Sequence, residues 1–178
     1  MKILVFSDSH GRTIDMYGLI EAEDPDAVIH LGDHYEDACD LRRSYPNIPV
    51  YAVRGNNDFE PDAPLFSVIA PEGVRMYLTH GHRDRVGWTD TGHVGARAAE
   101  LGCVLALYGH THLRHDAMEG SVRVMNPGSI SMPRSGRGSC IRLTLEGGRL
   151  LAAEFLDADG APYKESPDKK TKKRFGWF

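Results

Sequence analysis

Side chains that commonly bind metal ions stand at the ends of several apolar segments in this chain. Asp8 and His10 follow residues 3–6, an apolar run rich in strand-forming residues. Asp33 follows a second such run, and Asn56 follows a third. Imidazole and carboxylate groups together favour Mn, Fe, Zn, Ni or Co over Ca²⁺. The complete candidate set is Asp8, His10, Asp33, Asn56, His80, His110 and His112.

This set is too large for one ion and suits two. In dinuclear hydrolytic centres the ions lie about 3.5–4 Å apart, which requires a bridging carboxylate. Two divalent ions, Asp8, Asp33 and a bridging hydroxide would together carry a charge of about +1. A phosphodiester anion complements that charge, so the residue types favour hydrolysis of a phosphate ester.

The elements that must position these side chains are strands and helices in alternation. The hydrophobic patterns predict strands at 3–6, 27–30, 49–53, 74–80, 103–108 and 121–125, and a hairpin at 141–145 and 149–156. Helices are expected between Gly11 and Pro25, at 36–44 and at 92–101, with a turn-rich stretch at 61–73. This order is typical of parallel βαβ units. Ligands of such sheets bind beyond the carboxyl ends of the strands, where the candidate ligands stand.

Length and composition set the class of protein. A chain of 178 residues forms one well-buried domain and is short for two. No apolar run approaches the roughly 18 residues of a membrane span, so no membrane partner is expected. Cys39, Cys103 and Cys140 form no close pair, so a disulfide framework is not expected and the reducing cytoplasm is the expected location.

Charge divides the chain into an acidic body and a basic tail. The whole chain has a formal charge of −4, and residues 164–178 carry six basic and two acidic side chains, which leaves residues 1–163 at −8. An acidic body argues against broad binding of polyanions, although the tail also ends in aromatic residues, a combination that suits nucleic acid. Nucleic acid is therefore a candidate partner because of the tail, and the acidic body does not indicate it. The simpler interpretation of the tail is that its basic side chains are solvated.

Several short motifs occur in an order that resembles a known family. The residues that carry the resemblance are Asp8-x-His10, Gly32-Asp33, Gly55-Asn56, His80-Gly-His82, Gly109-His-Thr-His112 and Asn126-Pro-Gly-Ser129. Together they resemble the calcineurin-like metallophosphoesterase superfamily, in particular its small single-domain bacterial and archaeal phosphodiesterase branch. The resemblance spans residues 1–156 and implies an α/β fold, a four-layer α/β/β/α sandwich of two mixed sheets flanked by helices. Residues 157–178 would form a separate C-terminal tail.

The resemblance also implies a division of the ligands and an activity. One ion would be held by Asp8, His10, Asp33 and His112, and the other by Asp33 as the bridge, Asn56, His80 and His110. The expected activity is a phosphodiesterase dependent on two divalent transition-metal ions, Mn²⁺ first among them. A metal-bound hydroxide would attack a small phosphodiester. A homodimer is the assembly that the family suggests.

One position departs from the family pattern. Much of the family has His directly after the Asn of Gly-Asn, where it is thought to act on the leaving group, and here that residue is Asn57. Since Asn donates no proton at neutral pH, the general acid is unassigned. We hypothesise that His82 or His34 takes part of its role, with His82 counted beside Asp33 and Asn56 as a catalytic candidate.

Other interpretations compete with this one. A fold of this kind can serve as a non-catalytic scaffold for protein assembly, and within enzymes the site would also suit a phosphomonoesterase. Structural roles are expected for His30, as a buried histidine with satisfied hydrogen bonds, and for Asp58, in an Asx turn. His93 and His115 are expected on the surface.

Overall fold

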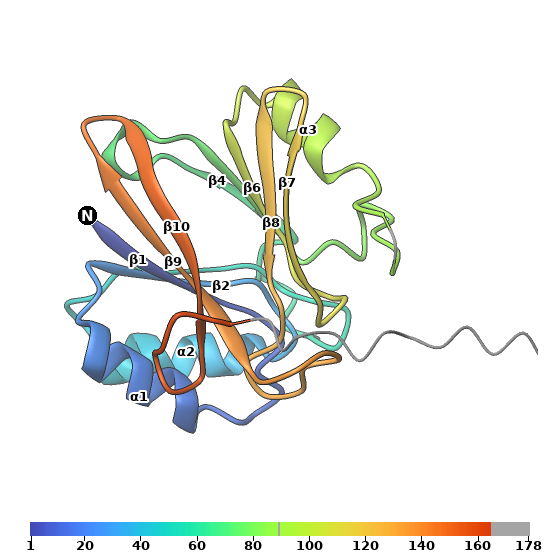
Figure 1. Cartoon of the computed structure of the whole chain (residues 1–178). Coiled ribbons are helices and arrows are strands. Elements are labelled where there is room, and N and C mark those ends of the chain that lie inside the picture. The colour runs from blue at the N-terminus through green and yellow to red at the C-terminus, as the bar shows by residue number, and fades with distance from the viewer. Residues whose placement is uncertain (89, 165–178) are drawn as a thin grey trace, which may run out of the picture.

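Two five-stranded sheets form the centre of the protein (Figure 1). The computed structural model describes residues 1–88 and 90–164. The first sheet has the order β10-β9-β1-β2-β3 and the second the order β4-β5-β6-β8-β7. The strands of the first sheet are β1 (Lys2–Phe6), β2 (Ala27–His30), β3 (Val50–Ala52), β9 (Ser139–Glu146) and β10 (Arg149–Asp157). Those of the second are β4 (Phe66–Ile69), β5 (Met76–Thr79), β6 (Leu105–Leu107), β7 (Arg114–Glu119) and β8 (Val122–Pro127).

Strand β1 shows why the first sheet is covered on both faces. Successive strand residues point to opposite faces, so Ile3 and Val5 enter the apolar layer between the two sheets. Leu4 and Phe6 pack on the other side. The buried residues there include Met16 of α1 (Ile14–Glu23) and Leu41 of α2 (Tyr35–Ser44), so the two helices cover that face.

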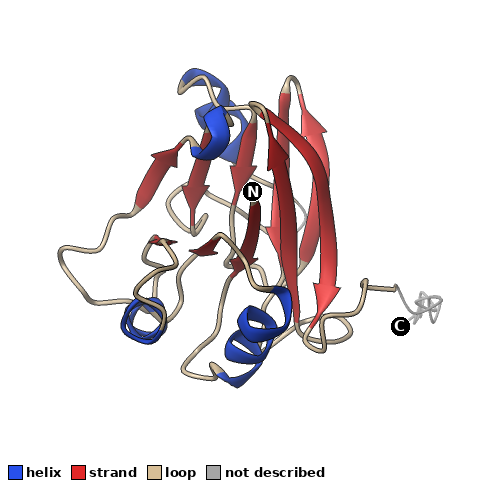
Figure 2. Ribbon diagram, turned by 90° about the vertical axis from the view of Figure 1, so that its left-hand side faces the viewer, coloured by secondary structure: helices blue, strands red, loops and turns tan. Residues whose placement is uncertain are grey.

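The second sheet repeats this arrangement. Met76 and Leu78 of β5 belong to the layer between the sheets, whereas Tyr77 faces outward. The outer side packs against Val94 and Ala98 of α3 (Val94–Glu100). Helices therefore lie outside both sheets (Figure 2). The expected fold, a four-layer α/β/β/α sandwich of two mixed sheets, is confirmed.

Parallel pairing brings several strand ends to one edge of the sandwich. In the first sheet β1, β2 and β3 run parallel, and in the second β5, β6 and β8 do. Each predicted helix and strand is present, and most of their boundaries differ from the predicted ones by one or two residues. Two strands were not predicted: β4, whose sequence lies within the turn-rich stretch, and β7, a half-polar strand at the sheet edge.

Packed structure continues past residue 156. Strand β10 ends at Asp157, and the chain turns back so that the Tyr163 N–H donates to the Phe155 carbonyl at 2.8 Å. The Arg114 guanidinium stacks over the Tyr163 ring at 3.5 Å. Most of the basic tail, residues 165–178, lies outside the described residues. Within the described part, none of the helices could span a membrane.

Candidate metal centre

Four of the predicted ligands meet at the carboxyl ends of β1 and β2 and in the loop after β6. Asp8, His10, Asp33 and His112 each offer a ligand atom, and these atoms all lie within 4.8 Å of one another. His112 Nε2 lies 3.2 Å from Asp8 Oδ1 and 3.3 Å from His10 Nε2. These four residues are the set that the resemblance implies for one ion.

A second group of imidazoles adjoins this cluster. His80 Nε2 lies 3.4 Å from Asp33 Oδ1 and 4.0 Å from Asp8 Oδ1. The His80 ring centroid lies 5.1 Å from that of His110 and 5.5 Å from that of His82. Asp33 therefore stands between the first cluster and the histidines expected to hold the second ion.

Backbone carbonyls set the tautomers of two of these histidines. His80 Nδ1 donates to the Leu31 carbonyl at 2.7 Å, and His112 Nδ1 donates to the Met132 carbonyl at 2.8 Å. A carbonyl only accepts, so Nδ1 carries the proton in each ring and the Nε2 lone pair of the neutral ring faces the cluster. Metal-binding histidines are commonly oriented by such a bond.

The backbone is strained where the ligands stand. The φ angles of Asp8, His10 and Asp33 are 54°, 48° and 54°, and those of His110 and His112 are 71° and 58°. Residues other than glycine adopt this left-handed region at a cost of about 1–3 kcal/mol each, and such residues concentrate at functional sites. The fold thus holds these five side chains in place against a local preference.

Close approach of the loops explains two glycines in the motifs. A Cβ on Gly109 would clash with Ser7 Oγ and lie 2.9 Å from Asp8 Oδ2. A Cβ on Gly55 would clash with Asp33 Oδ1. Each glycine allows one loop to pass directly over a carboxylate that another strand presents.

Opposite charges hold the centre together when no metal is bound. Burial opposes ionisation of Asp8, but the His112 imidazole, whose Nε2 lies 3.2 Å from Oδ1, and the charge of His80 outweigh it and lower its pKa. Burial likewise opposes ionisation of Asp33, and the close approach of His80, whose Nε2 lies 3.4 Å away, outweighs it, so the Asp33 pKa is also lowered. Conversely, Asp8 raises the pKa of His112, and Asp33 and Asp8 raise that of His80 despite its burial.

The pKa values of His110 and His82 are lowered, so these two imidazoles favour the neutral form. Burial first, and then the charge of His80, lower the pKa of His110. Burial, His80, His110 and Arg83 lower the pKa of His82 to about 4. Neutral imidazoles beside ionised carboxylates are the state in which such side chains bind metals.

Two buried atoms test whether these residues fit a metal ion. Asp8 Oδ1 and His80 Nε2 are buried and have no hydrogen-bond partner among the described residues. An unpaired buried polar atom is costly, so its presence in a folded protein needs an explanation such as a bound ion. Both atoms face the same cluster of carboxylates and imidazoles, and the donor set therefore fits a divalent transition metal.

Two residues outside the predicted ligand set hold Asp33, the expected bridging ligand, in position. Asn57 Nδ2 donates to Asp33 Oδ2 at 2.7 Å, and the Asn57 backbone N–H donates to Oδ1 at 3.0 Å. Asp58 accepts the backbone N–H groups of Asp33, His34, Tyr35 and Gly55 at 2.7–3.1 Å. The bond from Gly55, three residues before Asp58, closes the loop after β3 in place of the expected Asx turn, in which the donor would lie two residues after the aspartate. The other three bonds tie this loop to the start of α2.

A series of side-chain hydrogen bonds supports the loop after β1. The Gly32 N–H donates to His30 Nδ1 at 3.3 Å, so Nε2 carries the proton and donates to Ser9 Oγ at 2.8 Å. Ser9 donates in turn to Asp37 at 2.6 Å, and the other Asp37 oxygen accepts from His34 at 2.9 Å. The prediction that His30 is a satisfied core histidine is confirmed.

Asn56 and His82 lie at the rim of the centre. Asn56 is exposed and His82 is half-buried, and both line one hollow with Arg54 and Arg83. The roles of Asn56 as a ligand and of His82 in catalysis therefore stay predictions.

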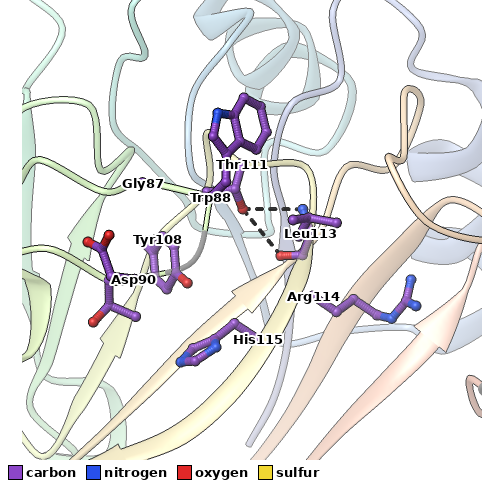
Figure 3. Close-up of a pocket in the computed structure, with 9 residues that line it drawn as sticks. Gly87, Trp88, Asp90, Tyr108, Thr111, Leu113, Arg114 and His115 are labelled. Carbon is purple, nitrogen blue, oxygen red and sulfur yellow. Dashed lines mark hydrogen bonds between the residues drawn. The ribbon is translucent and has the colours of Figure 1, made fainter. Parts of the chain in front are cut away.

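A smaller pocket is lined in part by Tyr108, Thr111 and Leu113, at and after the end of β6 (Figure 3). Its volume is about 140 Å³, and its lining includes Trp88, Asp90 and His115. The Arg134 guanidinium stacks on Trp88 at 3.8 Å. The expectation that His115 lies on the surface is wrong, because its ring is half-buried with its centroid 6.0 Å from that of Tyr108.

Two mixed sheets with carboxylates and imidazoles gathered at their strand ends define a metallophosphoesterase. A model of the calcineurin-like phosphoesterase superfamily domain matches residues 1–148. The chain belongs to this superfamily, as the resemblance implied.

Two relatives illustrate the similarity in sequence. The probable metallophosphoesterase YsnB of Bacillus subtilis is 30% identical over 175 residues, which cover 96% of this chain and 99% of that protein. The phosphodiesterase YfcE of Escherichia coli is 40% identical over 95 residues, which cover 49% of this chain and 47% of that protein.

Solved structures show the same fold. A predicted phosphoesterase from Streptococcus pneumoniae superposes with a TM-score of 0.74 and 28% identity, covering 91% of this chain and 92% of the other. A Vps29 variant from Entamoeba histolytica superposes with a TM-score of 0.69 over 88% of this chain and 99% of the other. At 21% identity, the likeness to Vps29 concerns the fold alone.

Proposed function

We propose that this protein is a phosphodiesterase that depends on two divalent transition-metal ions. The observation that carries the proposal is a pair of buried atoms, Asp8 Oδ1 and His80 Nε2, which lie 4.0 Å apart and have no hydrogen-bond partner among the described residues. His80 Nε2 lies 3.4 Å from Asp33 Oδ1. The phosphodiesterase YfcE supports a diester as the substrate.

The residues of the chain would divide the work as follows. Asp8, His10, Asp33 and His112 would hold one ion, and Asp33, Asn56, His80 and His110 would hold the other. Such ions supply Lewis-acid activation of water and of the phosphoryl group. Asp33 would fix the spacing of the two, and Asn57 holds the Asp33 carboxylate in position.

The mixed donor set also supports a choice of metal. Imidazoles and carboxylates suit Mn²⁺, Fe²⁺, Zn²⁺, Ni²⁺ and Co²⁺, and we propose Mn²⁺ as the first to test. Ca²⁺, which prefers six to eight oxygen ligands, fits this donor set poorly.

Hydrolysis of bis-p-nitrophenyl phosphate tests the proposal. Chelator-treated protein is assayed with and without added Mn²⁺, beside Asp33→Asn and the control Asp62→Asn, which changes an exposed aspartate outside the centre. We expect metal-dependent activity that Asp33→Asn abolishes and Asp62→Asn retains. Absence of activity with Mn²⁺, Ni²⁺, Fe²⁺ and Zn²⁺ would contradict the proposal and favour the scaffold.

The two competing functions have separate tests. The likeness to Vps29 concerns the fold alone and does not decide between scaffold and enzyme, whereas the buried donor atoms of the centre favour hydrolysis. Parallel assays with p-nitrophenyl phosphate would identify a phosphomonoesterase if the monoester is turned over faster than the diester.

The location of the protein in the cell and its assembly are also proposed. Cys39, Cys103 and Cys140 are free thiols, which supports the reducing cytoplasm as the location. A homodimer stays a prediction from the resemblance, and size-exclusion chromatography with light scattering would test it.

A further inference from the structure

A basic hollow opens beside the proposed second metal position. Its volume is about 320 Å³, and its lining includes Arg54, Asn56, His82 and Arg83. Asn56 and His82 belong to the predicted site, so the hollow is continuous with the place where the reacting phosphate would lie.

Neither guanidinium is neutralised by the protein. Among residues 1–88 and 90–164, no carboxylate oxygen lies within 4 Å of a side-chain nitrogen of Arg54 or Arg83, in contrast to paired arginines such as Arg97. Arg54 Nη1 donates to the Glu60 backbone carbonyl at 3.1 Å, while Arg54 Nε is buried and has no partner in the part of the chain that the structure describes. Arg83 is exposed.

One acidic side chain also borders the hollow. Asp58 lines it, but its two oxygens accept four backbone N–H groups and are directed to the loops. Two arginines against this one carboxylate leave a positive site on a body with a formal charge of −8. A positive site on an acidic body favours a small anion over a long polyanion.

The chemistry of the hollow matches a phosphate group. Guanidinium groups present a planar fork of donors that binds phosphate oxygens, often through two bonds. A volume of about 320 Å³ is at the lower limit of pockets for small ligands, and it suits one substituent of a substrate better than a whole nucleoside with its phosphates.

We propose that Arg54 and Arg83 bind a second phosphate of the substrate. The natural substrate is then a small phosphodiester that carries a further phosphate, placed toward His82 when the diester lies at the metal centre. This inference rests on the proposed function and adds the class of substrate to it.

Two esters that differ by one phosphate test the inference. The full-length, Mn²⁺-loaded protein is assayed with thymidine 5′-(p-nitrophenyl phosphate) and with its 3′-phosphorylated form. Because hydrogen bonds between ionised groups are stronger than those between neutral ones, we expect kcat/KM to be about tenfold or more higher for the 3′-phosphorylated ester. Arg83→Gln and Arg54→Gln should lower this ratio toward one.

Arg85 provides the matched control, because it is an exposed arginine of the same loop that does not line the hollow. Arg85→Gln should retain the ratio of the wild type. Thermal melting shows whether Arg54→Gln, a half-buried position, still folds, and exposed Arg83 tests the inference without that concern. A ratio near one in the wild type, or an unchanged ratio in Arg83→Gln, would overturn the inference.

Failure of the proposed function has a different signature. If neither ester is hydrolysed, the metal-dependent activity is absent, and calorimetry then tests the hollow directly. The metal-free protein should bind thymidine 3′-phosphate about tenfold more tightly than thymidine, which has no phosphate, and Arg83→Gln should remove the difference. Equal affinities in the wild type would overturn the inference.

Discussion

Asn57 donates a hydrogen bond of 2.7 Å from its side-chain amide to Asp33, at the position where much of the family has histidine. The Asn57 backbone N–H reaches the other oxygen of the same carboxylate at 3.0 Å. The residue that cannot serve as a proton donor to the leaving group therefore has a role in orienting the proposed bridging ligand.

Removal of this amide should weaken metal binding. Groups that orient a metal ligand typically contribute about 10–100-fold to affinity, so Asn57→Ala should need about tenfold more Mn²⁺ for half-maximal activity. The backbone bond to Asp33 remains, which keeps the loss at the lower end of that range. A Mn²⁺ titration of diester hydrolysis measures it, with exposed Asn47→Ala as the control. Equal Mn²⁺ requirements in both variants would refute this role.

A methyl group on Gly109 should disturb the centre. Its Cβ would clash with Ser7 Oγ and crowd Asp8, and overpacking of this kind costs about 1–3 kcal/mol. Gly109→Ala should therefore lower both the stability and the metal affinity, as measured by urea unfolding with and without Mn²⁺.

Gly18 gives the matched comparison. It lies within α1, and a Cβ there would have no heavy atom within 4 Å. Gly18→Ala should raise stability by about 0.5–1 kcal/mol, because glycine in a helix interior is less favourable than alanine. Destabilisation by Gly18→Ala as large as that by Gly109→Ala would show that crowding of Asp8 is not the cause.

The fold was predictable where the hydrophobic pattern is strong. Residues 3–6 are apolar on both faces because one face meets the other sheet and the other meets helices. The edge strands β4 and β7 were missed, because an edge strand is partly exposed and its polar residues resemble a loop. Each pairs with the next strand along the chain, β4 with β5 and β7 with β8, but neither edge strand has an apolar alternation strong enough to indicate the hairpin.

The candidate site was predictable only in part for a related reason. Asp and His residues at the ends of apolar strands can be recognised from the sequence, since parallel strands bring those ends together. The supporting roles of Asn57 and Asp58 could not, because their partners Asp33 and His34 lie more than twenty positions away. An asparagine and an aspartate in a polar turn look the same whether they close the turn alone or also hold a neighbouring loop.

The free energy of unfolding should decrease as the pH is lowered through a range set by His30. Burial lowers the pKa of this imidazole to about 4 from its usual 6.5, so the unfolded chain binds a proton that the folded protein excludes between these values. The free energy of unfolding should therefore fall by about 2–3 kcal/mol between pH 7.5 and 4.5 through this group, with no further loss from it below pH 4.

Denaturant unfolding of the metal-free protein at the two pH values measures this loss. His30→Gln does not titrate, so it should lose about 2–3 kcal/mol less than the wild type over the same interval, whatever its stability at pH 7.5. His93→Gln changes an exposed histidine and should follow the wild type. The same pH dependence in His30→Gln and the wild type would contradict the assignment.

Hydrolysis of poor leaving groups should depend on a histidine near the centre. His82 Nδ1 is buried without a partner among the described residues, but its pKa of about 4 leaves little of the ring protonated near pH 7. His34 donates to the buried carboxylate of Asp37. If either takes part of the role of the missing acid, His82→Ala or His34→Ala should lower kcat by about tenfold or more for a diester with an alkyl leaving group. An aryl leaving group needs less protonation, so its kcat should change less. The hypothesis is wrong if neither variant changes alkyl-ester hydrolysis.

Removal of the metal should lower the thermal stability of the protein. The centre buries Asp8 and Asp33 beside histidines, and a ligand that binds only the folded state stabilises it by about 2.7 kcal/mol at one hundred times its Kd. For a chain of this size we expect Tm to rise by about 5–10 °C when Mn²⁺ is added to chelator-treated protein, as followed by differential scanning calorimetry. Ca²⁺ should give a much smaller rise, because imidazole ligands suit it poorly. Asp33→Asn should abolish the Mn²⁺ effect, and an equal rise in that variant would show that the ion binds elsewhere.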